Sequence, residues 1–148
     1  MVDEADLELR NHTYGRFVEL GRAPRFDELA DELGRPLEDV ASGMRRLHDA
    51  HAVVLEPDGA SIRMANPFSA LPTPHRVLAG GRTWYANCAW DAFGILAALD
   101  VDGHVSSSCP DCRAAVEINV HDRAPADDDH LVHVNVPAAH WWDDIVFT

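Results

Sequence analysis

The sequence predicts an α+β protein in which a lobe of three helices precedes a mixed or antiparallel β-sheet packed on one central helix. Three observations predict this fold. Helical periodicity runs through the first third of the chain, an apolar helix-forming run occupies 92–99, and strand-like runs follow it. We divide the chain into a lobe at 1–66 and a second domain at 67–148.

The lobe has the pattern of a winged helix-turn-helix. Apolar side chains recur at three- and four-residue steps over 5–21 and again over 37–50, which predicts two helices. A shorter helix at 25–34 lies between them and closes at its final glycine. A hairpin over 52–64 follows and turns at 56–59. Three helices and a two-stranded wing make up this pattern.

The second domain reads as strands around the central helix. Residues 66–76 contain three prolines and no helical period, so we expect an extended linker there. A second hairpin turns at Gly80-Gly81 and leads into the central helix. We expect the acidic stretch 127–129 to be a solvated turn. Three further strands are predicted, at 104–108, 115–120 and 130–136.

The charge of the protein argues against nucleic acid as a partner. The 148 residues carry a net charge of −13, and residues 1–66 hold eight arginines against fourteen acids. Phosphate binding needs a basic face, so a DNA-binding regulator is the less favoured alternative, and we expect the lobe to serve as a packing element or lid. No apolar run reaches the roughly 18–20 residues that span a bilayer. The acidic N-terminus does not resemble a secretion signal, so we expect a cytoplasmic protein without membrane contact.

Cys88 and Asp91 are the candidate catalytic pair. If Asn87 caps the central helix, Cys88 is its first residue and Asp91 lies about one turn further on, on nearly the same face. A helix N-terminus lowers the pKa of a thiol, whereas a neighbouring carboxylate opposes that effect and can hold a proton close to sulfur. The pair is thus a soft nucleophile or metal ligand beside a proton carrier. The alternative is a buried, inert cysteine.

A second thiol pair lies in Cys109-Pro110-Asp111-Cys112, at a turn between two predicted strands. That setting favours a metal-binding or structural role over a thioredoxin-like redox pair. Two thiols supply only half of the ligands of a structural zinc site, and Cys88 could be a third. Cys88, Cys109 and Cys112 together are therefore a candidate site for Zn(II), Cu(I) or Hg(II). The alternative is a pair of thiols that only stabilises the turn.

Four segments of the chain carry a further pattern: Asn66-Pro67-Phe68-Ser69, Trp84-Tyr85-Ala86-Asn87-Cys88-Ala89-Trp90-Asp91, Ser107-Ser108-Cys109-Pro110-Asp111-Cys112 and Trp141-Trp142-Asp143-Asp144-Ile145-Val146-Phe147-Thr148. The Cys-x-x-Asp motif in its aromatic frame is the most specific of the four. Together these segments resemble the organomercurial (alkylmercury) lyase family, particularly its bacterial members with an N-terminal winged-helix domain.

The resemblance implies that Cys88 is the family's first catalytic thiol, Asp91 its catalytic carboxylate, and Cys109 a structural cysteine. It implies protonolysis of a carbon–mercury bond: one thiolate captures the soft metal, a second weakens the bond, and the acid protonates the departing carbon. The expected partners are a small organometal or another small molecule, and low-molecular-weight thiols. No cofactor is required.

The family's second catalytic cysteine would come directly after Thr148, the last residue of the sequence. We expect lyase-type activity if that thiol lies beyond the given chain or is replaced by Cys112, Asp143 or Asp144, and loss of activity otherwise. Two alternatives stay open: a thiol-based metal-binding module without turnover, and a non-mercury enzyme that uses the same site. The apolar C-terminal residues could form a homodimer contact.

Overall fold

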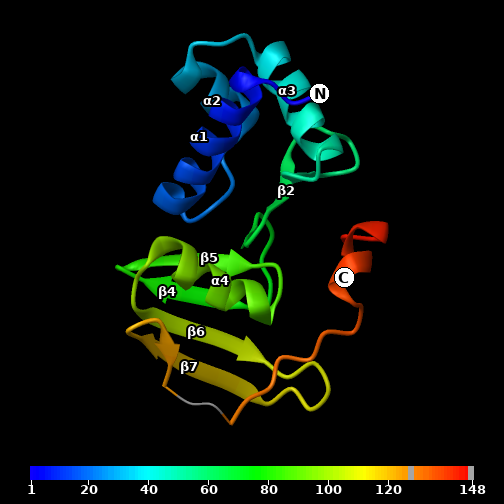
Figure 1. Ribbon diagram of the computed structural model, residues 1–148. Coiled ribbons are helices and arrows are strands. Elements are labelled where there is room, and N and C mark those ends of the chain that lie inside the picture. The colour runs from blue at the N-terminus through cyan, green and yellow to red at the C-terminus, as the bar shows by residue number, and fades with distance from the viewer. Residues whose placement is uncertain (127–128, 147–148) are drawn as a thin grey trace.

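Three helices form the N-terminal lobe, as predicted: α1 Glu4–Leu20, α2 Phe26–Leu33 and α3 Leu37–Asp49 (Figure 1). The computed structural model describes residues 1–126 and 129–146. Asp3 caps α1, because its carboxylate accepts the backbone N–H of Asp6 at 2.9 Å and the Asp6 carboxylate accepts the N–H of Asp3. The first two helices each end at a glycine in the left-handed region.

The first and third helices approach each other closely at an ion pair whose carboxylate is buried. The Arg46 guanidinium on α3 donates to both carboxylate oxygens of Asp6 on α1, at 2.8 and 2.7 Å. Gly43 makes this approach possible, because a Cβ atom there would lie 2.9 Å from the nearer Asp6 oxygen and from a Leu9 methyl group. This ion pair thus joins α1 to α3 at their point of close approach.

An eight-stranded sheet in the described residues follows the helices, and every neighbouring pair in it is antiparallel. The strand order is β1-β2-β3-β5-β4-β6-β7-β8. Helix α4, Ala89–Leu99, connects β5 to β6 and packs on β4, β5 and β6 (Figure 1). The strands are β1 Val54–Leu55, β2 Ile62–Ala65, β3 Phe68–Ser69, β4 Arg76–Ala79, β5 Arg82–Ala86, β6 Gly103–Ser108, β7 Ala115–His121 and β8 Ala124–Pro125.

The sheet and the core both cross the predicted domain boundary. Ala65 in β2 pairs with Phe68 in β3, so the lobe's hairpin and the second domain share one sheet. Phe17 of α1 stacks on Phe68 with 5.5 Å between ring centroids, and the Trp84 indole N–H donates to the Phe17 carbonyl oxygen at 3.0 Å. These contacts fix α1 against the centre of the sheet. The division at residue 66 and the winged-helix assignment stay predictions.

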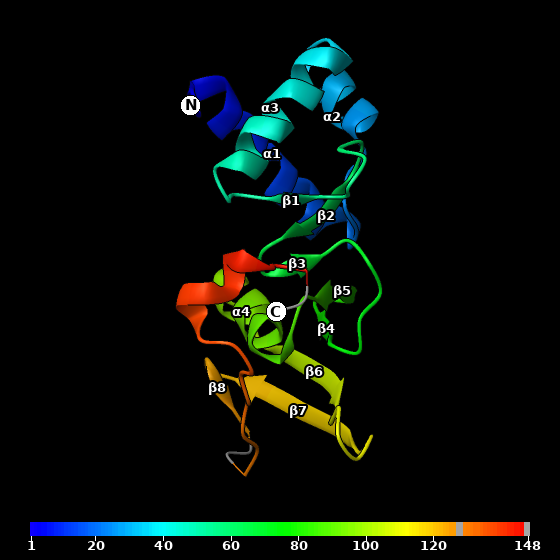
Figure 2. The ribbon, with the colours of Figure 1, turned by 90° about the vertical axis from the view of Figure 1, so that its right-hand side faces the viewer.

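The predicted strand at 130–136 is wrong. This segment has no regular structure, and Leu131 is 94% exposed. The outer position belongs instead to β8, which reaches β7 through a turn at Asp122 and Arg123, both with φ in the left-handed region. A short 3₁₀ helix, η1 Ala138–Asp143, follows and lies beside α4 (Figure 2). Asp127, Asp128, Phe147 and Thr148, which belong to sequence predictions above, lie outside the described residues.

Candidate functional site

Cys88 is the N-cap of α4, one position later than the sequence predicts. Its backbone is extended, and its sulfur accepts the backbone N–H of Asp91 at 3.4 Å. Asn87, the predicted cap, is not the N-cap, and its side-chain amide donates to Asn66 Oδ1 at 2.9 Å. The thiol therefore satisfies a free N–H of the helix, and the Asp91 carboxyl group lies in the first turn beside it.

Burial changes the chemistry of this pair. It raises the pKa of the Cys88 thiol, and the negative charge of Asp91 adds to that effect, while N–H groups at the start of the helix oppose it. Burial also raises the pKa of Asp91, against hydrogen bonds from Asn87 and from the Cys88 thiol. The sequence predicts competing influences on the thiol; in the folded chain the influences that retain its proton prevail. Both groups are thus held towards their protonated forms.

Tyr14 on α1 is a neighbour of the pair that the sequence analysis did not single out. Its hydroxyl donates to the Asn66 carbonyl oxygen at 3.0 Å, and its ring meets Phe68 edge-on. Burial raises the pKa of Tyr14, Arg10 over the ring opposes this, and the charge of Asp91 adds a smaller upward effect. The lobe therefore contributes a phenol to the surroundings of the acid. Tyr14 fits the helical apolar stripe of 5–21, so periodicity alone gives no signal for this role.

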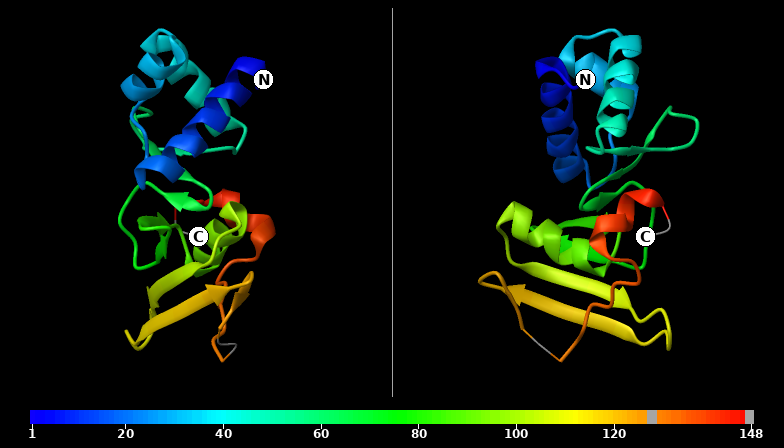
Figure 3. Two further views of the ribbon diagram at one scale, coloured as in Figure 1. Left: turned by 90° about the vertical axis from the view of Figure 1, so that its left-hand side faces the viewer. Right: turned by 45° about the vertical axis from the view of Figure 1, so that its right-hand side comes forward.

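The C-terminal segment lies against the same side of the molecule. Trp142 in η1 stacks on His51, which follows α3, with ring centroids 4.0 Å apart and an interplanar angle of 4°. The Trp141 indole N–H donates to the Val136 carbonyl oxygen at 2.7 Å. Figures 2 and 3 show η1 next to α4, between the lobe and the outer strands. Trp90, in the first turn of α4, is 63% exposed.

The other two cysteines lie on the turn between β6 and β7. All three cysteines are free, and Cys112 is exposed. No three His, Cys, Asp or Glu side chains within 1–126 and 129–146 come together in a way that could hold a metal ion. The structure thus brings Cys88 together with Asp91, and Cys109 with Cys112, but does not gather the three thiols into one such cluster.

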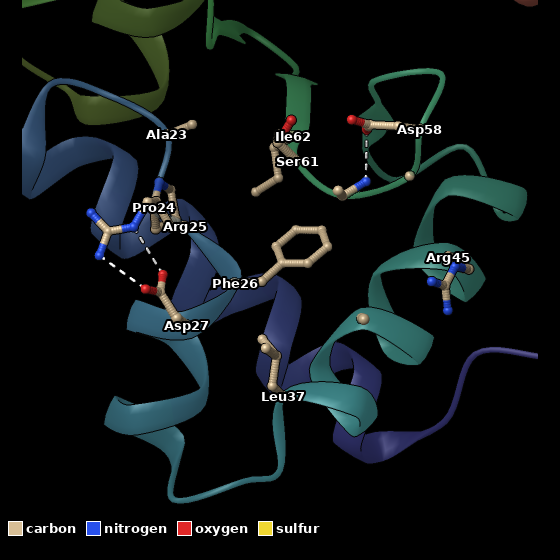
Figure 4. A pocket seen from close by; sticks show the side chains of 13 residues that line it. Ala23, Pro24, Arg25, Phe26, Asp27, Leu37, Arg45, Asp58, Ser61 and Ile62 are labelled. Atoms are coloured by element: carbon tan, nitrogen blue, oxygen red, sulfur yellow. Dashed lines mark hydrogen bonds and ion pairs between the residues drawn. The ribbon is translucent and has the colours of Figure 1, made fainter.

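A cavity of about 600 Å³ lies away from the cysteines, between α2, α3 and the β1–β2 hairpin (Figure 4). Phe26, Leu37 and Ile62 give it an apolar lining, and Arg25 and Asp27 at its rim pair with each other at 2.9 Å. None of the predicted site residues lines it. Its volume suits a small molecule, but its residues include no thiol, histidine or buried acid to carry out chemistry.

The fold and the Cys88–Asp91 pair together define a candidate thiol–carboxyl site at the start of a helix. In the part of the chain that the structure describes, no helix is long and apolar enough to cross a membrane. The family model for MerB, alkylmercury lyase, matches residues 68–148, and the chain belongs to the alkylmercury lyase family.

Individual relatives agree with this family. The chain is 29% identical over 94 residues to the alkylmercury lyase of Staphylococcus epidermidis (strain ATCC 12228 / FDA PCI 1200). This alignment covers 64% of this chain and 41% of that protein. The fold of this chain is similar to that in the crystal structure of the mercury-bound form of MerB2, with a TM-score of 0.68 and 24% sequence identity. That match covers 85% of this chain and 60% of the other. The chain thus spans about half the length of these relatives.

Proposed function

We propose that the Cys88–Asp91 site cleaves carbon–mercury bonds by protonolysis. One observation carries this proposal: a thiol and a carboxylic acid share the first turn of α4, and burial favours the protonated form of each. A soft sulfur suits mercury, and a carboxylic acid whose pKa is raised holds its proton to higher pH than an ordinary carboxyl group and so suits proton delivery. Membership of the alkylmercury lyase family supports the assignment.

The first step is capture of the metal by thiol exchange. An organomercurial R–Hg–SR′ carries a small thiolate ligand, R′S⁻. The Cys88 sulfur forms a new bond to mercury, the Hg–SR′ bond breaks, and the proton of the Cys88 thiol leaves with R′SH. The raised pKa of Cys88 is compatible with this step, because the departing thiolate takes up the proton that the cysteine gives up.

The second step is proton delivery to carbon. Asp91 gives its proton to the carbon atom, the electron pair of the Hg–C bond becomes the new C–H bond, and R–H leaves. Mercury stays as Hg(II) on the Cys88 sulfur, and no electron is gained or lost. A second thiolate, from a small thiol or another cysteine, raises the electron density on mercury and eases the cleavage. Positioned acid catalysis of this kind contributes about 10²–10⁴ in rate.

The test is release of hydrocarbon. The protein is incubated with phenylmercury and excess small thiol, and benzene is measured by gas chromatography. We expect Cys88→Ser to release none, and Asp91→Asn to release it more slowly by about 10²–10⁴ while still retaining mercury. Asp100→Asn is the matched control, because this exposed acid at the other end of α4 is remote from the thiol. Equal release by wild type and Cys88→Ser would refute the proposal.

Measuring retained mercury and released benzene in the same samples also distinguishes the two alternatives. A thiol module that binds metal without turnover would retain mercury in the wild type and release no benzene. A non-mercury enzyme would do neither. The cytoplasmic location and the homodimer contact stay predictions of the sequence.

A further inference from the structure

The turn between β6 and β7 holds Cys109 and Cys112 in a closed loop. The backbone N–H of Cys109 donates to the Ala114 carbonyl oxygen at 2.9 Å, and the N–H of Arg113 donates to the Cys109 carbonyl oxygen at 2.9 Å. Arg113 adopts a left-handed conformation with φ of 62°, which reverses the chain into β7. The two thiols are thus held on one short, hydrogen-bonded turn at the surface.

The two sulfurs of this turn differ in environment. Cys109 is half-buried. Cys112 is exposed, and both thiols are free. Two free thiols therefore lie three residues apart on one turn, and one of them is accessible from solvent, which is a suitable arrangement for binding a cation from solution.

We propose that Cys109 and Cys112 form a two-sulfur binding site for a soft metal cation, separate from Cys88. Hg(II) is soft and is satisfied by two thiolates, whereas structural zinc needs four ligands, and the described residues offer no third group here. On binding, each sulfur loses its proton to solvent and forms one S–Hg bond, without any redox change. The turn therefore selects ions that accept two sulfur ligands.

The strand register places this dithiol at the end of the sheet where α4 begins. Arg76 in β4 pairs with Tyr85 on one side and Ser106 on the other, so β5 and β6 end at the same edge. His75, just before β4, contacts both of these strand ends. Its carbonyl oxygen accepts a hydrogen bond from the backbone N–H of Ala86 at 2.9 Å, and its ring Nδ1 is hydrogen-bonded to the Ser107 hydroxyl at 2.8 Å. If the proposed lyase function holds, the dithiol is placed to accept Hg(II) that leaves Cys88.

The experiment uses Hg(II) itself as the probe and a Cys88→Ser background. The full chain is reduced with a phosphine, given one equivalent of HgCl₂, challenged with excess monothiol, and examined by native mass spectrometry. We expect one mercury per chain to survive the challenge. Adding Cys109→Ser or Cys112→Ser should abolish retention, because a single protein thiolate has no chelate advantage over the competing thiol. Asp111→Asn, on the same turn, should retain mercury.

Alkylation gives a second readout. Bound mercury should protect the peptide containing Cys109 and Cys112 from iodoacetamide, and circular dichroism should show that the exposed Cys112→Ser variant is folded. Failure of the Cys88→Ser protein to retain mercury, or retention by a variant with only one of the two thiols, would overturn the proposal. Neither result depends on hydrocarbon release. The proposed lyase function can therefore be refuted while the dithiol site is supported, and the dithiol site can be refuted while the lyase function is supported.

Discussion

The hydroxyl of Tyr14 lies 3.0 Å from the carbonyl oxygen of Asn66 and donates a hydrogen bond to it. The side-chain oxygen of Asn66 also accepts a hydrogen bond from the side-chain amide of Asn87, the residue immediately before Cys88. Helix α1 and the start of α4 are therefore joined through a single residue of the connecting chain. The N-terminal lobe in this way helps to position the segment that carries the candidate thiol.

Replacing Tyr14 by phenylalanine should weaken this connection. Tyr14→Phe keeps the ring that packs against Phe68 but leaves the Asn66 carbonyl without its donor, so we expect the free energy of unfolding to fall by about 1 kcal/mol. Benzene release should fall as well. Urea unfolding measures the first effect. Tyr85→Phe is the control, because no side-chain hydrogen bond of Tyr85 occurs among the described residues; an equal loss in both variants would contradict this role.

The periodicity of the sequence predicted most elements because they are set by local patterns. The helices at 5–21, 25–34 and 37–50, and the strands at 104–108 and 115–120, all occur with small shifts at their ends. The failure at 130–136 has a physical cause. Alternation shows that a strand is compatible with the sequence, but a strand also needs a partner, and β8 occupies that edge through a turn at Asp122-Arg123 that has no glycine or asparagine signal.

The candidate site was likewise predictable from the sequence only in its local part. Spacing along a helix was enough to place Asp91 beside Cys88, because three residues of helix fix their relation. The direction of the thiol's pKa shift depends on how much of the pair the rest of the chain covers, which no local pattern gives. The contact of Tyr14 with Asn66 joins residues 52 positions apart and could not be predicted from either segment.

The Asp6–Arg46 pair should contribute strongly to stability. The Asp6 side chain is 2% exposed, so Arg46→Ala would leave a buried carboxylate with no cation. Because Arg46 itself is 40% exposed, we expect a loss of stability smaller than that for a fully buried pair. Arg45→Ala, at the next position on α3, should change stability by less than about 0.5 kcal/mol. Thermal or urea unfolding of the two variants provides the comparison.

The pH dependence of that loss has a defined sign. The Arg46 hydrogen bond lowers the pKa of Asp6, so the pair stabilises the fold above the ordinary carboxyl pKa of about 3.9 and loses this contribution as the pH falls through the lowered value. The difference between wild type and Arg46→Ala should therefore shrink in acid. A difference that stays constant down to the lowest pH at which the protein folds would exclude this account.

Alkylation rates should separate the cysteines at neutral pH. Burial and the Asp91 charge raise the pKa of Cys88, whereas backbone N–H groups lower that of Cys109. We expect iodoacetamide to modify Cys109 before Cys88, and Cys88 only as the pH rises. Asp91→Asn removes the nearby negative charge, so it should speed the reaction of Cys88 and leave Cys109 unchanged. Peptide mass spectrometry gives both rates; a slower Cys88 in Asp91→Asn would show that the carboxylate does not hold the thiol proton.

The Asp91 carboxyl group should lower the free energy of unfolding at neutral pH. Because burial raises the pKa of Asp91 in the folded chain, the folded state favours its protonated form, and the favourable contribution is complete only below the unfolded pKa of about 3.9. As the pH rises through the folded value, that contribution is lost. Asp91→Asn keeps the shape without the charge, so it should be more stable than wild type at pH 7, and this advantage should disappear in acid. If Asp91→Asn were less stable than wild type at pH 7, the carboxylate would be a net stabilising group, and a proton retained by burial could not be the basis of its reactivity.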